Sequence, residues 1–279
     1  MSARWLVDGR PAASVSPLDR GLLYGDGLFE TVLCGRGRPT LWREHWRRLE
    51  SGCRRLGIEP PEEPRLLREM RRLAADLPRA VLRITVTRGV AAARGEAAPT
   101  GRATRILCAW PEPAPDPERY RRGVRVRWCR LRLAERPELA GIKHLNRLEL
   151  VLARREWRDP RIAEGLLRDA GDRLVCACAA NVFLVRGGTL WTPALDRCGV
   201  AGTLRAFLLA RLPTRIAAIP AAWVEEAEEL FLTNAVRGVV PVRAVGRRSL
   251  PIGPVTRRAM ALLHASEPLL QPPADEECR

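Results

Sequence analysis

Prolines recur at every second position from Pro111 to Pro117. A proline lacks the backbone N–H and disfavours a helix for the residue before it, so this stretch forms neither a helix interior nor a central strand. The stretch therefore predicts a domain boundary in the 279-residue chain. We expect a smaller N-terminal α/β domain over 1–112, a proline-rich linker over 113–122, a larger C-terminal domain over 123–270 and a disordered tail over 271–279.

Basic side chains outnumber acidic ones, with 48 Lys and Arg against 32 Asp and Glu and a formal charge of +16. The arginines are spread along the chain with acidic residues among them, which does not favour nucleic-acid binding. We expect the charge to attract an anionic small-molecule substrate instead. We see neither a secretory signal nor an apolar run of membrane-spanning length, and so expect a cytoplasmic protein with no membrane partner.

The eight cysteines are scattered, and the only close pair is Cys176 and Cys178. Without an export signal they are expected to be reduced thiols. A Cys-x-Cys pair with no second cluster is a poor zinc site. The three histidines, His45, His144 and His264, are widely separated. We therefore expect no metal site and no Ser–His triad.

A single lysine, Lys143, stands among the 48 basic residues. An arginine stays protonated in proteins, whereas a lysine amine can lose its proton and attack a carbonyl carbon. Lys143 is therefore a candidate nucleophile, although a lysine left by chance in an arginine-rich chain would look the same.

A second chemical signal is the segment Gly199–Gly202, which leads into a helix predicted to begin at Thr203. Backbone N–H groups at the start of a helix bind phosphate, although glycine pairs before helices are common. A nucleophilic lysine and a phosphate-binding turn together suggest pyridoxal 5'-phosphate, held as a Schiff base.

Hydrophobic periodicity predicts the elements around these residues. The spacing of Trp42, Trp46 and Leu49 predicts an amphipathic helix over 42–57. Alternation of apolar with polar residues predicts a half-buried strand over 82–87. Two further expectations are a glycine-rich loop over 19–27 and a helix over 144–158 that starts directly after Lys143.

Several motifs resemble one family. The segment Gly141-Ile-Lys-His-Leu-Asn-Arg-Leu-Glu149 is similar to the lysine segment of the lyases that act on 4-amino-4-deoxychorismate. These lyases belong to the fold-type IV pyridoxal-phosphate family, with the branched-chain and D-amino-acid aminotransferases. The resemblance extends to about residue 258. Its other motifs lie at 19–30, 45–49, 88–95, 179–183, 192–193 and 234–235.

The resemblance implies a role for each matched position. Lys143 would bind the cofactor and move protons, and Arg48 in the His-x-x-Arg-Leu motif would bind the cofactor phosphate. Arg94 would lie near the substrate carboxylates. The remaining cofactor-binding positions that the resemblance implies are Cys176, Gly202, Thr203, Leu204, Asn234 and Ala235.

One position departs from the family pattern. The family has a glutamate five residues before the Asn of Ala-Ala-Asn181, and this chain has Cys176 there. A carboxylate keeps the pyridine nitrogen protonated and so improves the electron sink, which a thiol does poorly. Glu164 or Asp169 are candidates to replace it, but the sequence does not place them.

The resemblance implies a two-domain α/β (α+β) fold of type IV, with the cofactor in the interdomain cleft, Lys143 in the C-terminal domain and a homodimer. It implies a lyase that yields 4-aminobenzoate and pyruvate for folate synthesis. The alternatives are a branched-chain or D-amino-acid aminotransferase, and a degenerate homologue of low activity because of Cys176.

Overall fold

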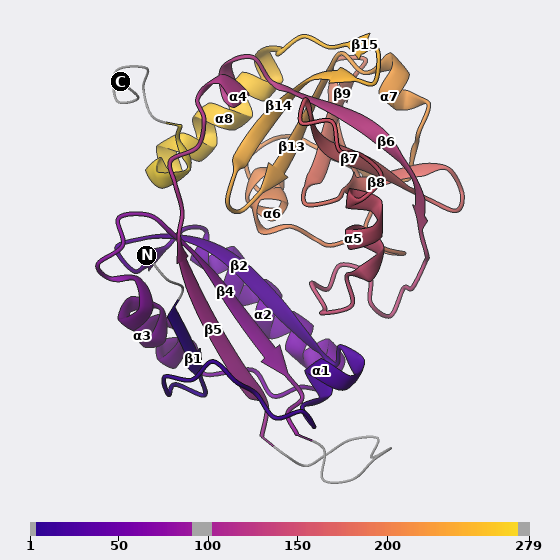
Figure 1. Ribbon diagram of the computed structural model, residues 1–279. Helices are drawn as coiled ribbons and strands as arrows, with labels where there is room; N and C mark the ends of the chain where they lie inside the picture. Colours follow the sequence, from indigo (N-terminus) through magenta and orange to yellow (C-terminus); the bar gives the residue numbers. More distant parts are fainter. Residues whose placement is uncertain (1–3, 91–101, 273–279) are drawn as a thin grey trace. The chain divides into compact units, whose positions relative to one another are not determined.

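The computed structural model describes residues 4–90 and 102–272. Its chain divides into two compact units. Unit 1 comprises Met1–Pro113 and Ile142–Asn146, and unit 2 comprises Ala114–Gly141 and Arg147–Arg279. No helix among the described residues is long and apolar enough to cross a membrane. The mixed helix and sheet content of both units matches the expected α/β (α+β) class (Figure 1).

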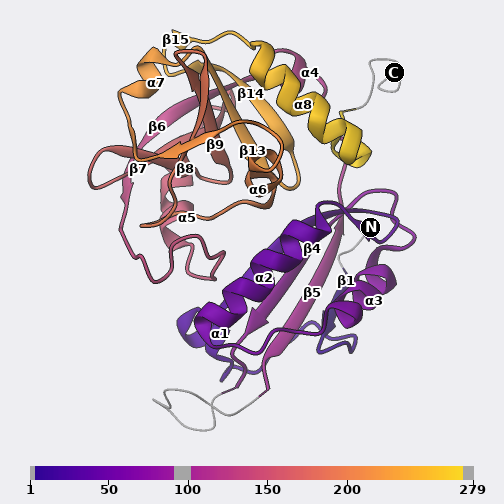
Figure 2. The same ribbon diagram turned by 180° about the vertical axis from the view of Figure 1, so that it is seen from behind.

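Unit 1 is an antiparallel sheet in the order β1-β5-β4-β2-β3, with helix α2 against one face (Figure 2). Side chains of β2 and β4 alternate between the two faces. Leu28, Val32, Leu82 and Ile84 join Leu49 of α2 in the core. The elements are β1 (Arg4–Val7), α1 (Arg20–Tyr24), β2 (Gly27–Gly35), β3 (Arg38–Pro39), α2 (Trp42–Leu56), α3 (Glu63–Ala74), β4 (Ala80–Thr87) and β5 (Thr104–Pro111).

Unit 2 is a ten-stranded mixed sheet in the order β11-β10-β9-β13-β14-β6-β7-β8-β12, with β15 paired to β14. Helix α8 packs against β13 and β14 (Figure 1). The elements are α4 (Glu118–Arg121), β6 (Val124–Leu133), α5 (Leu148–Arg154), β7 (Ile162–Asp169), β8 (Arg173–Ala177), β9 (Asn181–Arg186), β10 (Thr189–Pro193), α6 (Thr203–Leu209), β11 (Arg215–Ala217), β12 (Ile219–Pro220), α7 (Trp223–Glu226), β13 (Glu229–Asn234), β14 (Gly238–Val245), β15 (Arg248–Ser249), α8 (Pro254–Ser266) and the 3₁₀ turn η1 (Pro268–Leu270).

The segment after Lys143 is extended where a helix is expected, and α5 begins only at Leu148. The backbone explains this difference, because Phe29 N donates to the Lys143 carbonyl at 2.9 Å and Leu145 N donates to the Gly27 carbonyl at 2.9 Å. These bonds continue the pairing of β2, which the helical conformation would break. They also place Lys143 in unit 1, whereas the sequence suggests the C-terminal domain.

The linker expected over 113–122 contains a helix. Its last part is α4, where Tyr120 is buried and its hydroxyl donates to the Arg237 carbonyl at 2.7 Å. The chain therefore packs into unit 2 soon after the prolines. The expected tail 271–279 falls outside the described residues from position 273 onward.

The loop expected over 19–27 contains a short helix, α1. Asp19 starts it, because its carboxylate accepts from Gly21 N at 2.8 Å. Gly25 ends it with φ 66°, a conformation that favours glycine. Capping by Asp19 and Gly25 explains this helix. The glycine-rich composition of the segment predicts a loop instead.

Candidate active site

Lys143 is held beside the start of β2. In addition to the two backbone bonds, Leu28 and His144 form an isolated antiparallel bridge. Gly27 is required for this approach, because a Cβ there would lie 2.9 Å from Leu145 Cδ1 and 2.5 Å from the Val86 carbonyl. The Lys143 Nζ lies 4.3 Å from the centroid of the Phe29 ring. A fixed backbone and an aromatic neighbour therefore orient this amine.

A buried network lies in the same unit, between β2 and α2. Glu30 Oε2 is 2.6 Å from His45 Nδ1 and 2.5 Å from Arg48 Nη2, and Glu30 Oε1 is 2.8 Å from Arg48 Nε. Burial alone would raise the pKa of Glu30, but the charge of Arg48 and the hydrogen bonds from Arg48 and His45 outweigh it and lower that pKa to about 2. Glu30 is therefore an anion. Arg48 is mostly buried and bonded to Glu30, so it is not a surface arginine surrounded by solvent.

The sequence did not single out Arg83. Its guanidinium carbon lies 3.9 Å from the Phe29 centroid, so one ring contacts both Arg83 and Lys143. Among the described residues no acidic side chain forms an ion pair with Arg83. Burial lowers the pKa of this half-buried group. The signal was the alternation over 82–87, which places Arg83 on the face of the sheet opposite Leu82 and Ile84.

In unit 2, helix α6 begins at Thr203 after Gly202. The N–H groups of its first turn, including those of Thr203 and Leu204, have no acceptor within the helix. A Cβ at Gly202 would lie 2.0 Å from Asn181 Oδ1, so only glycine fits there. Asn181 Nδ2 in turn donates to the Val200 carbonyl at 2.8 Å. The turn and the Ala-Ala-Asn motif thus form one structure.

Asn234 is committed to the turn between β13 and β14. Its Oδ1 accepts from Val236 N at 3.0 Å and Arg237 N at 2.7 Å, and its Nδ2 donates to the Ala179 carbonyl at 3.1 Å. Asn234 therefore shapes this loop, and the assignment of Asn234 and Ala235 to the cofactor stays a prediction. The position predicted for substrate carboxylates, Arg94, lies outside the described residues.

Cys176 is buried on β8 in an apolar core with three other thiols. Burial raises the pKa of the Cys176 thiol well above its usual value, so the side chain is neutral. The core cluster also contains Cys129, Cys178, Cys198 and Trp157.

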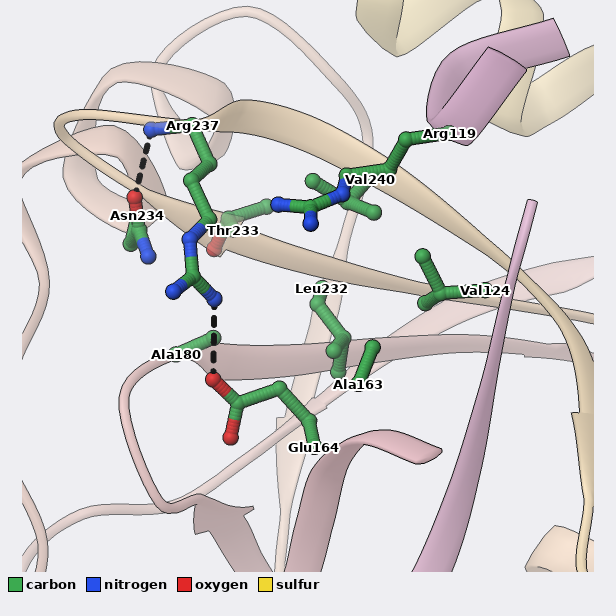
Figure 3. A pocket seen from close by; sticks show the side chains of 10 residues that line it. All are labelled: Arg119, Val124, Ala163, Glu164, Ala180, Leu232, Thr233, Asn234, Arg237 and Val240. Atoms are coloured by element: carbon green, nitrogen blue, oxygen red, sulfur yellow. Dashed lines mark hydrogen bonds and ion pairs between the residues drawn. The ribbon is translucent and has the colours of Figure 1, made fainter. Parts of the chain in front are cut away.

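Asp169 and Glu164, the two candidates to replace the family glutamate, each accept a hydrogen bond from an arginine. Asp169 Oδ2 accepts from Arg173 Nε at 2.7 Å. Glu164 Oε1 accepts from Arg237 Nη1 at 3.1 Å in a small cavity of unit 2 that Arg119 and Thr233 also line (Figure 3). Burial raises the pKa of Glu164, and Arg237 opposes that rise. Both carboxylates therefore already form an ion pair with an arginine.

Comparison with known proteins decides the family. The profile described as Amino-transferase class IV matches residues 27–245. The chain belongs to this family. Its class IV relatives include an aminodeoxychorismate lyase from Vibrio harveyi, 30% identical over 92% of this chain and 98% of the relative. The fold-type IV resemblance inferred from the motifs is thereby confirmed.

Solved class IV structures show the same fold. A 4-amino-4-deoxychorismate lyase from Pseudomonas aeruginosa is 46% identical with a TM-score of 0.89, covering 94% of this chain and 99% of that one. A branched-chain aminotransferase from Thermoproteus uzoniensis is 22% identical with a TM-score of 0.81, covering 96% and 97%. The second likeness concerns the fold alone.

Pyridoxal 5'-phosphate is the cofactor of this class IV family. The residues fit it in three respects: a lysine amine beside an aromatic ring, an arginine oriented by a carboxylate, and a helix start that only glycine can precede. At the position where the family resemblance implies an acid, this chain has the neutral Cys176 thiol.

Proposed function

We propose that this protein is an aminodeoxychorismate lyase, which converts 4-amino-4-deoxychorismate to 4-aminobenzoate and pyruvate for folate synthesis in the cytoplasm. The observation that carries the proposal is the likeness to the Pseudomonas aeruginosa lyase, at 46% identity over 94% of this chain. The lysine segment from Gly141 to Glu149 supports the same activity.

The bound cofactor supplies an electron sink for the carbon that loses a proton. Lys143 would hold the cofactor carbonyl through Nζ until the substrate amine replaces it there, which frees the lysine amine. The freed amine would take the proton from the amine-bearing carbon of the substrate and deliver it to the methylene carbon of the departing enolpyruvyl group, which leaves as pyruvate. The remaining ring is then aromatic. Phe29 beside Nζ keeps the amine oriented during both proton transfers.

The phosphate is assigned to Arg48 and to the backbone N–H groups of Thr203 and Leu204, with Gly202 as the close-approach residue. Cys176 is assigned to the pyridine nitrogen, and Asn234 with Ala235 to a loop beside the cofactor.

Arg83 is assigned to a carboxylate of the substrate, together with Arg94. The substrate is a dicarboxylate, and a half-buried guanidinium with no acidic partner among the described residues is a suitable counter-ion. Phe29 contacts the guanidinium at 3.9 Å and so restricts its movement.

A product assay tests the proposal against the aminotransferase alternative, which a D-alanine aminotransferase from Listeria monocytogenes, 26% identical, represents. We expect 4-aminobenzoate and pyruvate in equal amounts from aminodeoxychorismate, with no added keto acid. Amino transfer from D-alanine or valine to 2-oxoglutarate, with no 4-aminobenzoate, would overturn the lyase assignment. If the protein binds the cofactor but catalyses neither reaction, it is a degenerate homologue.

A homodimer is also part of the proposal. Leu22 and Tyr24 on α1 are 65% and 51% exposed, and Leu148 on α5 is 69% exposed. Apolar side chains of this size are usually covered in an assembly. Light scattering should give twice the 31.1 kDa chain mass, and a monomeric active protein would contradict the dimer alone.

A further inference from the structure

Glu30 contacts one edge of the Arg48 guanidinium. Both bonds lie along the Nε–Nη2 edge, at 2.8 and 2.5 Å. A guanidinium carries five N–H donors in a rigid plane, so two bonds along one edge fix the direction in which the opposite Nη1 edge points. The position of Arg48 on α2 alone would leave its long side chain several rotamers.

His45 fixes Glu30 in turn. Glu30 is ionised and can only accept hydrogen bonds, so the proton in its contact with His45 belongs to Nδ1. Burial lowers the pKa of His45 and keeps the ring neutral. The His45 side chain is fully buried and that of Glu30 is 1% exposed, so neither can move without disturbing the core. The arginine is thus held by a rigid pair of side chains.

A second buried ion pair in the same unit, Glu69 with Arg105, is an example of a purely structural pair. Glu69 accepts from Arg105 Nε at 2.8 Å and Nη2 at 2.7 Å, in the same edge-on geometry. Both of its side chains are closed off, at 6% and 9% exposed. Arg48 differs, because its side chain is 14% exposed while its carboxylate partner is 1% exposed. Arg105 is enclosed in the core, whereas part of the Arg48 side chain reaches the surface.

We propose that Glu30, held by His45, is a positioning residue that aims Arg48 at the cofactor phosphate and thereby makes the protein prefer phosphorylated over unphosphorylated pyridoxal. The inference rests on the proposed function, in which Arg48 binds that phosphate. Glu30 itself touches neither cofactor nor substrate in this scheme.

Binding of two probes to the full-length apoprotein tests it. Pyridoxal phosphate and pyridoxal both have the aldehyde that reacts with Lys143, and only the first has the phosphate. In Glu30→Gln we expect affinity for pyridoxal phosphate to fall by about 10-fold, as for other groups that orient a binding residue. Affinity for pyridoxal should change less than about 2-fold, because the lysine is unaffected. The matched control Glu69→Gln should leave the ratio of the two affinities unchanged.

Arg48→Ala distinguishes phosphate binding by Arg48 from the positioning of Arg48 by Glu30. If Arg48→Ala loses the preference for the phosphorylated form and Glu30→Gln keeps it, the positioning role is wrong and the assignment of Arg48 stands. If both variants keep the preference, Arg48 does not bind the phosphate and both statements fail.

Should Glu30→Gln not fold, Glu30→Asp decides the question. It keeps the charge and withdraws the carboxylate by one methylene. A selective loss of pyridoxal phosphate affinity supports the inference, whereas an equal loss for both probes, or none, overturns it.

Discussion

Two regions of the molecule differ in the charge of their side chains. We call the first the charged region; it lies in unit 1 and comprises Lys143, Arg48, Arg83 and Glu30. We call the second the thiol cluster; it lies in unit 2 and comprises Cys129, Cys176, Cys178 and Cys198.

The difference concerns what each region can contribute. In the charged region, Glu30 is ionised and Arg48 is bonded to it. In the thiol cluster, burial raises the pKa of Cys198 to about 11 and that of Cys176 further, so both thiols are neutral at physiological pH. The charged region therefore offers ionised side chains that are held in place, whereas Cys176 and Cys198 of the thiol cluster offer neutral ones.

The largest expected effect tests the charged region at its centre. Lys143→Arg keeps a positive charge but removes the amine, because a guanidinium does not form the covalent bond to the cofactor. We expect turnover to fall on the order of 10³-fold or more. Borohydride reduction of the parent followed by peptide mass mapping should find the pyridoxyl group on Lys143. An unmodified Lys143 in cofactor-loaded protein would contradict the assignment.

Acid should titrate the charged region, whereas Cys176 and Cys198 of the thiol cluster are already protonated at neutral pH. The pKa of Glu30 is lowered from 4.5 to about 2, so its stabilising contribution is complete above pH 4.5 and disappears as the pH falls toward 2. The difference amounts to about 3 kcal/mol. Urea unfolding from pH 7 to pH 3 should show a smaller loss for Glu30→Gln than for the parent. Equal losses in the two proteins would mean that Glu30 is not the titrating group.

Arg83→Ala tests whether a second charge of this region meets the substrate. Loss of a charged hydrogen bond costs about 1.5–3 kcal/mol, so KM for aminodeoxychorismate should rise roughly 10–100-fold. Cofactor affinity should not change. Arg4→Ala is the control, because Arg4 forms an exposed pair with Asp76. A fall in cofactor affinity with KM unchanged would place Arg83 on the cofactor instead.

The smallest effect concerns the thiol cluster. Asp169 and Glu164 each serve an arginine, so Cys176→Glu should improve the electron sink and raise turnover by a few fold, roughly 1 kcal/mol. Cys176→Ala is the control that removes the thiol and adds no charge. The carboxylate of Glu149 contributes to the raised pKa of Cys176, so it is the acid to examine if turnover does not rise. An unchanged rate in Cys176→Glu, with a loss in Glu149→Gln, would show that Glu149 has taken the role.

Much of this site was predictable because its signals are local. The isolated Lys143 and the helical spacing around Arg48 can be read within short segments, and Gly202 before Thr203 follows from glycine placement at a helix start. The helix expected over 144–158 is present as α5, but its expected start directly after Lys143 was wrong for a non-local reason. The backbone of Lys143 pairs with Phe29, which is more than a hundred residues away in sequence.

Side-chain partners were not predictable. The alternation over 82–87 shows that Arg83 occupies the more polar face, but its contact with Phe29 depends on the pairing of β2 with β4. Glu30 sits within an apolar strand and carries no periodic signal of its own. Only the packing of α2 on β2 brings His45 and Arg48 to it.

The return of Ile142–Asn146 to unit 1 has a consequence for synthesis on the ribosome. When Pro113 has been made, the stretch that bonds to Gly27 and Phe29 does not yet exist, and the start of β2 lacks its neighbour. Long-range pairings of this kind form late and slow folding. A fragment cut at Pro113 would carry Arg48 and Arg83 but no lysine. Nascent chains should therefore present Lys143 in its fixed position beside Phe29 only after the second passage into unit 1 is complete.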